Sequence, residues 1–423
     1  MVETQEQFPF GFLLKYLFTL LGLLLFLLDI ALDIWAVVSF YQDGAYVYMA
    51  LMIFLLLGSS VLLQVFSWLW YSDSLDKIET KVEKFAKSHL LIKPSHFLQL
   101  GVHLRYAGVI ETSTMDFLHR INNFSNNALH NIRKDVDVKL KHDFLMLRLF
   151  EAFSENTPQL TLILSRILQR GELELITGLK ILTAASAIAI NVALYHRGMH
   201  VYGSKARKMS LISTGIYFLW NLLVIIPRVT ALALFCSVLP YYIIAHFLSL
   251  WMLLVLVAWS QKTNFMKSPG WEWLFRAAVG LIWYFSWFNV SKKGNIKVKM
   301  VLYYSFMALD TVMLLGFWCW KVFEYAGCWS SLNPYIVIPT LLGLYVIGIL
   351  VKLIYYRWFH PKMAEPSEGP FRQAATYAAT YYADSTDSTV STDLSLEDTA
   401  AAPVQPLTGV LKRSRTMAAN FYF

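Results

Sequence analysis

Four polar side chains lie within one long apolar segment and could line a hydrophilic path across a membrane. They are Arg148, Glu151, Glu155 and Gln159, within residues 144–168 (FLMLRLFEAFSENTPQLTLILSRIL). At ~100° per residue, these positions fall within an arc of roughly 80° on one side of a helix. An ionised group at mid-membrane costs ~2.5–3.5 kcal/mol on insertion scales, so it normally faces the protein interior or a wet cavity. We interpret the set as a substrate path, with an ordinary ion pair between Arg148 and Glu151 or Glu155 as the alternative.

The first apolar segment also contains two carboxylates that are one helical turn apart. Asp29 and Asp33, in LLDIALDIW (27–35), project from the same face of a helix. Two uncompensated carboxylates repel each other, so we expect a cation, water or a choline-like headgroup between them. The alternative is that both lie near the headgroup zone beside Trp35 and anchor the end of the helix.

Two more ionised groups interrupt later apolar segments. Arg228 follows Pro227, which bends a helix and frees a backbone carbonyl, and Asp310 lies within FMALDTVMLL. Among the residues named so far acids exceed bases by five to two, so their complete pairing needs protonation, water or a guest cation. We therefore assign the candidate polar path across the membrane to these residues: Asp29, Asp33, Arg148, Glu151, Glu155, Gln159, Arg228 and Asp310.

The composition is that of a membrane protein. Of 423 residues, 57% are apolar and 16% are aromatic, against about 45–50% apolar residues in soluble domains. The net charge of +8 lies mostly in loops, which is typical of cytosolic-side bias and not of nucleic-acid binding. The sequence contains no nucleophile elbow, phosphate-binding glycine loop or metal-ligand cluster. We therefore expect no enzyme, no metal and no other cofactor.

Hydropathy predicts an all-α polytopic membrane protein with about eight transmembrane helices. Each is near the ~20 residues that a bilayer requires, and they cover 10–40, 46–70, 144–168, 175–195, 210–236, 241–260, 300–322 and 335–356. Two further segments, 97–110 and 271–290, are interpreted as partial or re-entrant.

Basic loops determine the predicted orientation, because positive charge is retained on the cytosolic side. The 71–143 connection contains 11 Lys or Arg residues and should be cytosolic. If 271–290 enters the membrane and returns, the basic loop 291–299 is cytosolic too, as are both termini. The membrane part then divides into two pseudo-repeats, 1–196 and 197–360, each with two helices on either side of a partial segment.

Residues 361–423 lose the apolar character and should form a largely disordered cytosolic tail. Within it, Asp384, Asp387 and the small Ser388 match the DxxD preference of executioner caspases, so we expect cleavage after Asp387. A basic and aromatic cluster could lie on the anionic inner leaflet or plug a cytosolic cavity; it comprises Lys412, Arg413, Arg415, Phe421, Tyr422 and Phe423.

The chain resembles the XK-related family of membrane proteins, and the likeness is strongest to the caspase-activated member. Coverage runs from about residue 12 to 361, through LLDIALDIW (27–35), QVFSWLW (64–70), MLRLFEAFSENTPQLTL (146–162), YFLWNLLVIIPRV (217–229), LFRAAVG (274–280), YFSWFNV (284–290) and YYRWFHP (355–361). The resemblance implies a phospholipid scramblase of the plasma membrane. It would exchange phosphatidylserine and other phospholipids between leaflets without energy input, after caspase cleavage of the tail in apoptosis.

The resemblance also implies a single-span immunoglobulin-type partner, basigin or neuroplastin, that assists surface delivery. Two other functions stay open at this point. A solute transporter could use the same buried charges around an enclosed site. Alternatively, the chain could be a non-transporting membrane scaffold for a partner protein.

Overall fold

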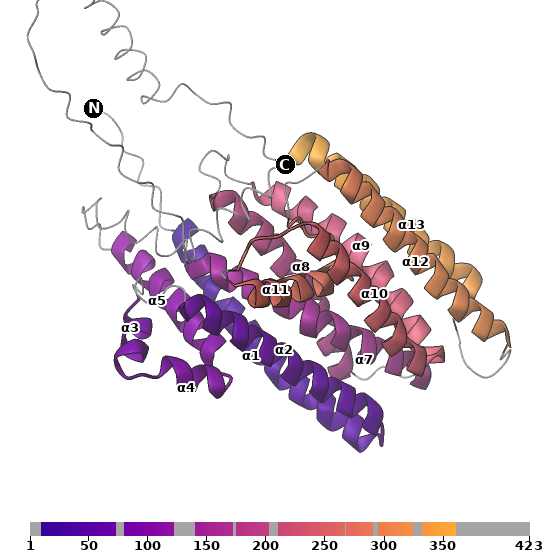
Figure 1. Ribbon diagram of the computed structural model, residues 1–423, viewed down its shortest axis with the longest axis horizontal. Coiled ribbons are helices and arrows are strands. Elements are labelled where there is room, and N and C mark those ends of the chain that lie inside the picture. Colours follow the sequence, from indigo (N-terminus) through magenta and orange to yellow (C-terminus); the bar gives the residue numbers. More distant parts are fainter. Residues whose placement is uncertain are drawn as a thin grey trace, which may run out of the picture.

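The computed structural model describes residues 10–72, 80–121, 140–171, 175–202, 210–266, 268–290, 295–324 and 332–360. Every regular element in these ranges is helical, and no described residue lies in a strand (Figure 1). The predicted all-α fold is therefore confirmed. The predicted cleavage site and terminal cluster both lie outside the described residues.

Seven of the described helices are long and apolar enough to cross a bilayer, and each matches a predicted span. Most of α9 is buried in protein, whereas the other six leave most of their spans outside the packed interior. Because α9 packs against α7, α8, α10, α12 and α13, it is the central helix of the bundle. The seven are α1 (Phe10–Gln42), α2 (Tyr46–Ser72), α8 (Leu175–Tyr202), α9 (Leu211–Val238), α10 (Pro240–Ser260), α12 (Ile296–Glu324) and α13 (Pro334–Ile354).

The remaining predicted span, 144–168, is a helical rod in the interior of the protein. It consists of a helix over 140–151, the π-helical turn η2 (Ala152–Asn156) and α7 (Thr157–Arg170). Its charges lower its hydropathy, but α2, α8, α9 and α11 pack around it. A charged helix can cross a bilayer when other helices shelter it from lipid, so the packing around this central rod is compatible with the predicted crossing, which stays a prediction.

The π turn in the central rod has a local cause. Pro158 has no N–H to donate to the helical ladder. The residue before it, Thr157, donates both its backbone N–H and its hydroxyl to the carbonyl of Ala152, five residues earlier, the hydroxyl at 2.6 Å. Wider turns of this kind are often found at functional positions, and this one carries Glu155.

The predicted re-entrant segment 271–290 contains one short helix, and its entry into the membrane stays a prediction. α11 (Pro269–Trp283) has 15 residues, or roughly 22 Å at 1.5 Å per residue, which is less than a bilayer core of about 30 Å. Gly280 allows a close approach to α10, because an added Cβ would lie 2.8 Å from Val255. After the helix, Trp283 Nε1 donates to the carbonyl of Phe288 at 2.6 Å and holds the chain as it turns back.

The other predicted partial segment, 97–110, contains a break between two helices. α4 (Ile92–Phe97) ends where the range begins, and α5 (Gly101–Ile121) contains the rest. The break includes Gln99, whose φ of 63° is left-handed. α5 packs against α1, α2, α3 (Lys81–Ser88) and α4 and is held to the bundle by polar contacts.

Those polar contacts converge on Ser67 of α2. Its hydroxyl accepts a bond from Arg105 Nε at 2.9 Å and lies 2.9 Å from His96 Nε2. Burial, and to a smaller extent the charge of Arg105, lowers the pKa of His96. These polar contacts hold α4 and α5 on α2 together with a small apolar cluster that includes Tyr71 and Ile92.

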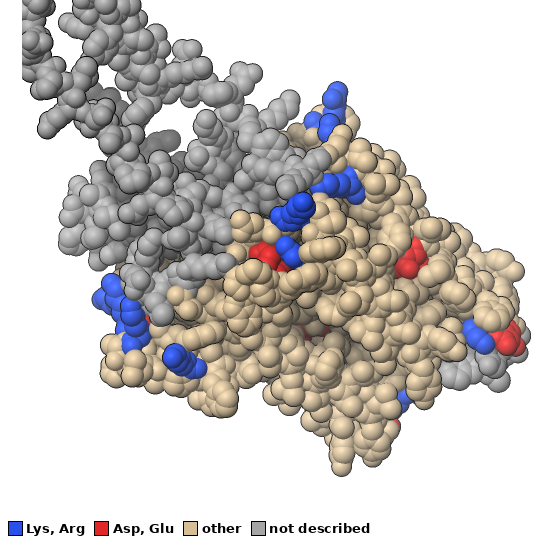
Figure 2. Space-filling view, in the orientation of Figure 1, with Lys and Arg blue, Asp and Glu red and all other residues tan. Residues whose placement is uncertain are grey.

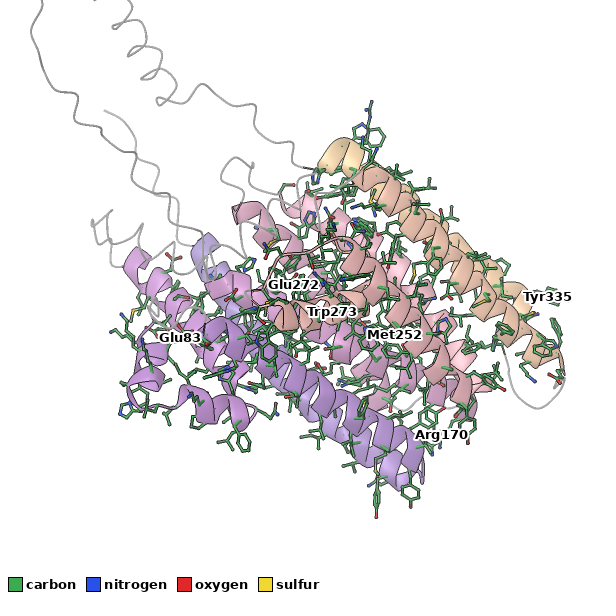
Figure 3. The ribbon with its side chains drawn as sticks, viewed as in Figure 1. Glu83, Arg170, Met252, Glu272, Trp273 and Tyr335 are labelled. Atoms are coloured by element: carbon green, nitrogen blue, oxygen red, sulfur yellow. The ribbon has the colours of Figure 1, made fainter. Side chains whose placement is uncertain are left out.

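Different parts of the chain lie at the two ends of the bundle. α1 begins, and η3 (Tyr355–Phe359) ends, at one end of the bundle, whereas Arg170 and Tyr335 lie at the opposite end (Figures 1 and 3). The first and the last described helical residues are therefore at the same end of the bundle. Between the two ends, the face in Figure 2 has few charged side chains, as a surface in contact with lipid requires.

The packing of α9 on α13 depends on Gly348. An added Cβ there would lie 2.9 Å from a methyl carbon of Val224 and 3.1 Å from the backbone carbonyl carbon of Leu223. A Cβ added at Gly343, on the same helix, would have no atom within 4 Å. Small residues at such contacts allow two membrane helices to approach closely.

Replacing Gly348 with Leu should therefore destabilise the protein by about 1–3 kcal/mol, because the added atoms overpack the contact. The measurement is the thermal unfolding midpoint of the purified protein in detergent. Gly343→Leu is the matched control and should unfold near the wild-type temperature. Equal midpoints for the two variants would contradict the close α9–α13 contact.

Candidate functional site

Three helices enclose a set of ionisable side chains, which we call the buried ionic stripe. α1 supplies two carboxylates, the central rod two carboxylates and a guanidinium, and α8 an ammonium group. α8 packs against both α1 and the central rod, which brings the six groups together. The stripe consists of Asp29, Asp33, Arg148, Glu151, Glu155 and Lys180.

The middle of the stripe is an ammonium group between two carboxylates. Lys180 Nζ lies 2.8 Å from Asp29 Oδ1 and 2.6 Å from Asp33 Oδ1. The expectation that a guest cation, water or headgroup separates the two aspartates is therefore wrong for this structure, since the chain's own lysine occupies that position. The lysine is 1% exposed, so each charge depends on the other two for its stability.

Lys180 was missed in the sequence although the signal was present. It stands alone among apolar residues in the predicted span 175–195. The rule that selected Arg148, an ion within a membrane segment, applies equally to it. A second missed cation is Lys352 of α13, which is buried with its Nζ 3.7 Å from the ring centre of Tyr304 and 4.7 Å from that of Trp220. The count of bases rises to four, still below the five acids.

Arg148 and Glu151 form the ion pair that the sequence left as an alternative. Arg148 Nη1 lies 2.6 Å from both carboxylate oxygens of Glu151. The guanidinium also lies over the ring of Phe26 on α1, at 4.9 Å from the ring centre. The pair connects the central rod to α1 by a contact that keeps the charge away from lipid.

Glu155 has no cation as a partner among the described residues. Its carboxylate is hydrogen-bonded to Ser59 of α2 and is repelled by the negative charges of Glu151 and Asp33. Ser59 also lies 2.7 Å from the hydroxyl of Ser154. The π turn thus places a carboxylate beside the hydroxyl group of Ser59, with no ammonium or guanidinium of the described chain as its partner.

Gln159 lies one turn beyond Glu155 and is fully buried. Neither side-chain atom of its amide is hydrogen-bonded within the described residues, and the same holds for Asn156. Buried amides normally have partners. Both residues are therefore candidates to contact a polar ligand that passes along the central rod.

Arg228 and Asp310 form a second cluster, joined to each other and not to the stripe. The Arg228 guanidinium is paired with Asp310, whose other oxygen lies 3.1 Å from His246 Nε2. The Tyr284 hydroxyl lies 2.8 Å from His246 Nδ1. Among the described residues no ion pair connects this cluster with the stripe, so the sequence grouped side chains that the structure divides.

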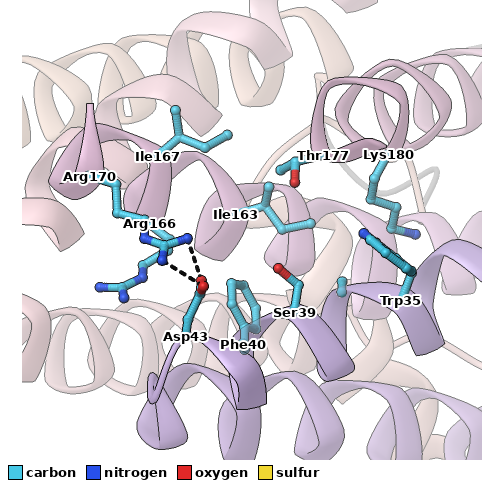
Figure 4. Close-up of a pocket in the computed structure, with 11 residues that line it drawn as sticks. Trp35, Ser39, Phe40, Asp43, Ile163, Arg166, Ile167, Arg170, Thr177 and Lys180 are labelled. Carbon is cyan, nitrogen blue, oxygen red and sulfur yellow. Dashed lines mark hydrogen bonds and ion pairs between the residues drawn. The ribbon is translucent and has the colours of Figure 1, made fainter. Parts of the chain in front are cut away.

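A hollow adjoins the stripe between α1, α7 and α8, with Lys180 in its wall (Figure 4). Its other end is bordered by Arg170 and Asp43, which are paired at 2.6 Å. The hollow therefore leads from an end of the bundle to the deepest cation of the stripe.

Comparisons with known proteins place the chain in a family. The sequence model of the XK-related family, described as XK-related protein, matches residues 17–361. The chain belongs to the XK-related family. The matched region contains the whole stripe and both members of the Arg228–Asp310 pair, and it stops where the predicted tail begins.

Several proteins of the family are similar to this chain over most of their length. XK-related protein 8 of Tetraodon nigroviridis is 36% identical, over 83% of this chain and 84% of that protein. XK-related protein 8 of Gasterosteus aculeatus is 36% identical over 84% and 85%, and that of Pan troglodytes is 35% identical over 81% and 82%. The resemblance noted in the sequence is confirmed at the level of the family.

Replacing Lys180 with Met should destabilise the protein by about 3–5 kcal/mol, because two buried carboxylates lose their counterion. The measurement is the unfolding midpoint in detergent. Adding Asp29→Asn and Asp33→Asn to the variant should restore much of the loss, since no buried charge is then unpaired. Lys321→Met is the control, because its pair with Glu324 lies near the surface and is worth about 0–1 kcal/mol. A Lys180→Met protein as stable as wild type would contradict the bridge.

Proposed function

We propose that this XK-related protein is a phospholipid scramblase, which moves phosphatidylserine and other phospholipids between membrane leaflets without energy input. The headgroup follows the buried ionic stripe while the acyl chains stay in the bilayer. Headgroups then exchange water for protein charges and dipoles, which reduces the cost of carrying charge through hydrocarbon. The observation that supports this most directly is the grouping of six ionisable side chains inside the bundle with a hollow at their edge.

The charge balance of the stripe suits a headgroup that carries an amine. Four carboxylates face two cations, for a net charge of 2 − 4 = −2 when all are ionised. Glu155, which has no cationic partner among the described residues, is the position where an ammonium or choline group would gain most. A zwitterionic headgroup can in turn offer its phosphate to Lys180 or Arg148.

The arrangement of the chain ends is compatible with regulation by the tail. Because α1 begins and η3 ends at the same end of the bundle, we propose that both termini are cytosolic in the plasma membrane. The tail that follows residue 361 contains the Asp384–Asp387 motif, and an executioner caspase would cut it after Asp387. Removal of the terminal cluster would then shift a closed–open equilibrium toward the open state. A basigin- or neuroplastin-type single-span protein is the proposed partner for surface delivery.

The decisive experiment is lipid transfer by purified protein in liposomes. Full-length chain and a chain that ends at residue 387 are reconstituted with fluorescent phospholipid, and dithionite bleaching reports exchange between leaflets. We expect rapid bleaching beyond the outer half with the shortened chain and slow bleaching with the full chain. In cells, Asp387→Ala should prevent phosphatidylserine exposure after an apoptotic stimulus. Saturable solute uptake without lipid movement would instead establish a transporter.

Replacing Glu155 with Gln should slow lipid transfer about tenfold or more, the effect of losing one charged hydrogen-bonding partner. The amide keeps the contact with Ser59, so folding and surface level should stay normal. Glu324→Gln, an exposed change on α12, is the control and should transfer lipid as wild type does. Normal transfer by Glu155→Gln would remove this carboxylate from the path. Lost transfer at normal surface level would exclude a pure scaffold.

A further inference from the structure

The hollow beside the stripe is lined by one face from each of three helices. On α7 the lining positions recur at three, four and seven residues, so they form a single helical face. α1 lines the hollow from Trp35 to Asp43, and α8 contributes Thr177 and Lys180. Both α1 and α7 border α8, so the hollow lies between α1 and α7 with α8 behind it.

Three cations and one carboxylate line this hollow. Arg166 and Arg170 come from α7, Lys180 from α8 and Asp43 from the end of α1. When all are ionised the lining carries a net charge of 3 − 1 = +2, opposite in sign to the stripe. The cations are graded in depth: the side chain of Arg170 is 38% exposed, Arg166 is half-buried and the side chain of Lys180 is 1% exposed.

Arg166 has capacity for a ligand that its neighbours do not use. Its guanidinium lies over the ring of Tyr48, 5.6 Å from the ring centre, and forms no ion pair with a described residue. Nε of Arg166 is buried and has no hydrogen-bond acceptor in the described chain. A guanidinium presents five donors in a planar fork that fits two oxygens of a phosphate.

The walls between these charges are apolar. Trp35 and Phe40 of α1 face Ile163 and Ile167 of α7, with Ser39 between the charged ends (Figure 4). Trp35 is 41% exposed. A free anion gains nothing from such walls, whereas a phosphodiester with glycerol and acyl carbons beside it matches both the charges and the apolar lining.

We infer that this hollow binds the phosphate of a membrane phospholipid through Arg166, Arg170 and Lys180. The inference rests on the proposed scramblase function for the destination of the lipid. Its phosphate replaces Asp43 beside Arg170 and later replaces Asp29 or Asp33 beside Lys180. In each exchange the cation keeps one anionic partner while the headgroup moves from the hollow to the stripe.

The test is ligand-induced stabilisation of the purified full-length protein in dodecyl maltoside, followed by tryptophan fluorescence during heating. Dihexanoylphosphatidylcholine is the probe, and dihexanoylglycerol is its match without phosphate. We expect the first to raise Tm and the second to leave it unchanged. Arg166→Gln should require about tenfold more probe for the same shift, as for the loss of a charged hydrogen bond. Arg166→Lys should recover part of the affinity.

Arg357→Gln, an exposed arginine on η3 away from the hollow, is the matched control and should respond as wild type does. The inference is overturned if dihexanoylglycerol gives an equal shift or if Arg166→Gln titrates as wild type. It is also overturned as a lipid site if inorganic phosphate or glycerophosphocholine gives the full shift at the same concentrations, since the site then takes soluble phosphate. Binding is measured without transport. Loss of liposome transfer with intact binding would therefore reject the proposed function alone, and intact transfer without Arg166-dependent binding would reject this inference alone.

Discussion

The interior of this protein depends on the bridge between Lys180 and the two aspartates of α1. A carboxylate that is removed from water without a partner costs several kcal/mol, and the bundle contains several of them. By placing one ammonium within 2.8 Å of both Asp29 and Asp33, α8 makes the polar face of α1 compatible with burial. Arg148 performs the same role for Glu151 within the central rod. Glu155 is the carboxylate that these two bridges leave without a cation among the described residues.

The requirement to keep these charges from lipid also explains the shape of the bundle. The central rod is too polar to face hydrocarbon, so α2, α8, α9 and α11 surround it. α9 is covered in turn by α10, α12 and α13 and is the most buried of the apolar helices. Close contacts at Gly280 and Gly348 allow these layers to approach without voids. The short helix α11 packs against η2 and so covers the π turn.

The two polar clusters have different character. Around Asp310, Arg228 and His246 use both carboxylate oxygens, and Tyr284 holds His246. This cluster ties α9, α10 and α12 together with few spare donors. The stripe, by contrast, has an excess of carboxylates, two buried amides without described partners and a basic hollow at its edge. A site built to exchange partners needs this excess, whereas a site built only for stability does not.

The sequence alone determined the helical class and the seven long apolar helices, because length and hydropathy are local properties of the chain. It also determined that Asp29, Asp33, Arg148, Glu151 and Glu155 must be shielded from lipid, since the cost of a buried ion does not depend on the fold. Which charges meet was decided by tertiary structure. Lys180 is about 150 residues from Asp29, and only the packing of α8 on α1 makes them partners. The same packing separated Arg228 and Asp310 from the stripe and created the hollow lined by Arg166 and Arg170, because helices distant in sequence supply its three walls.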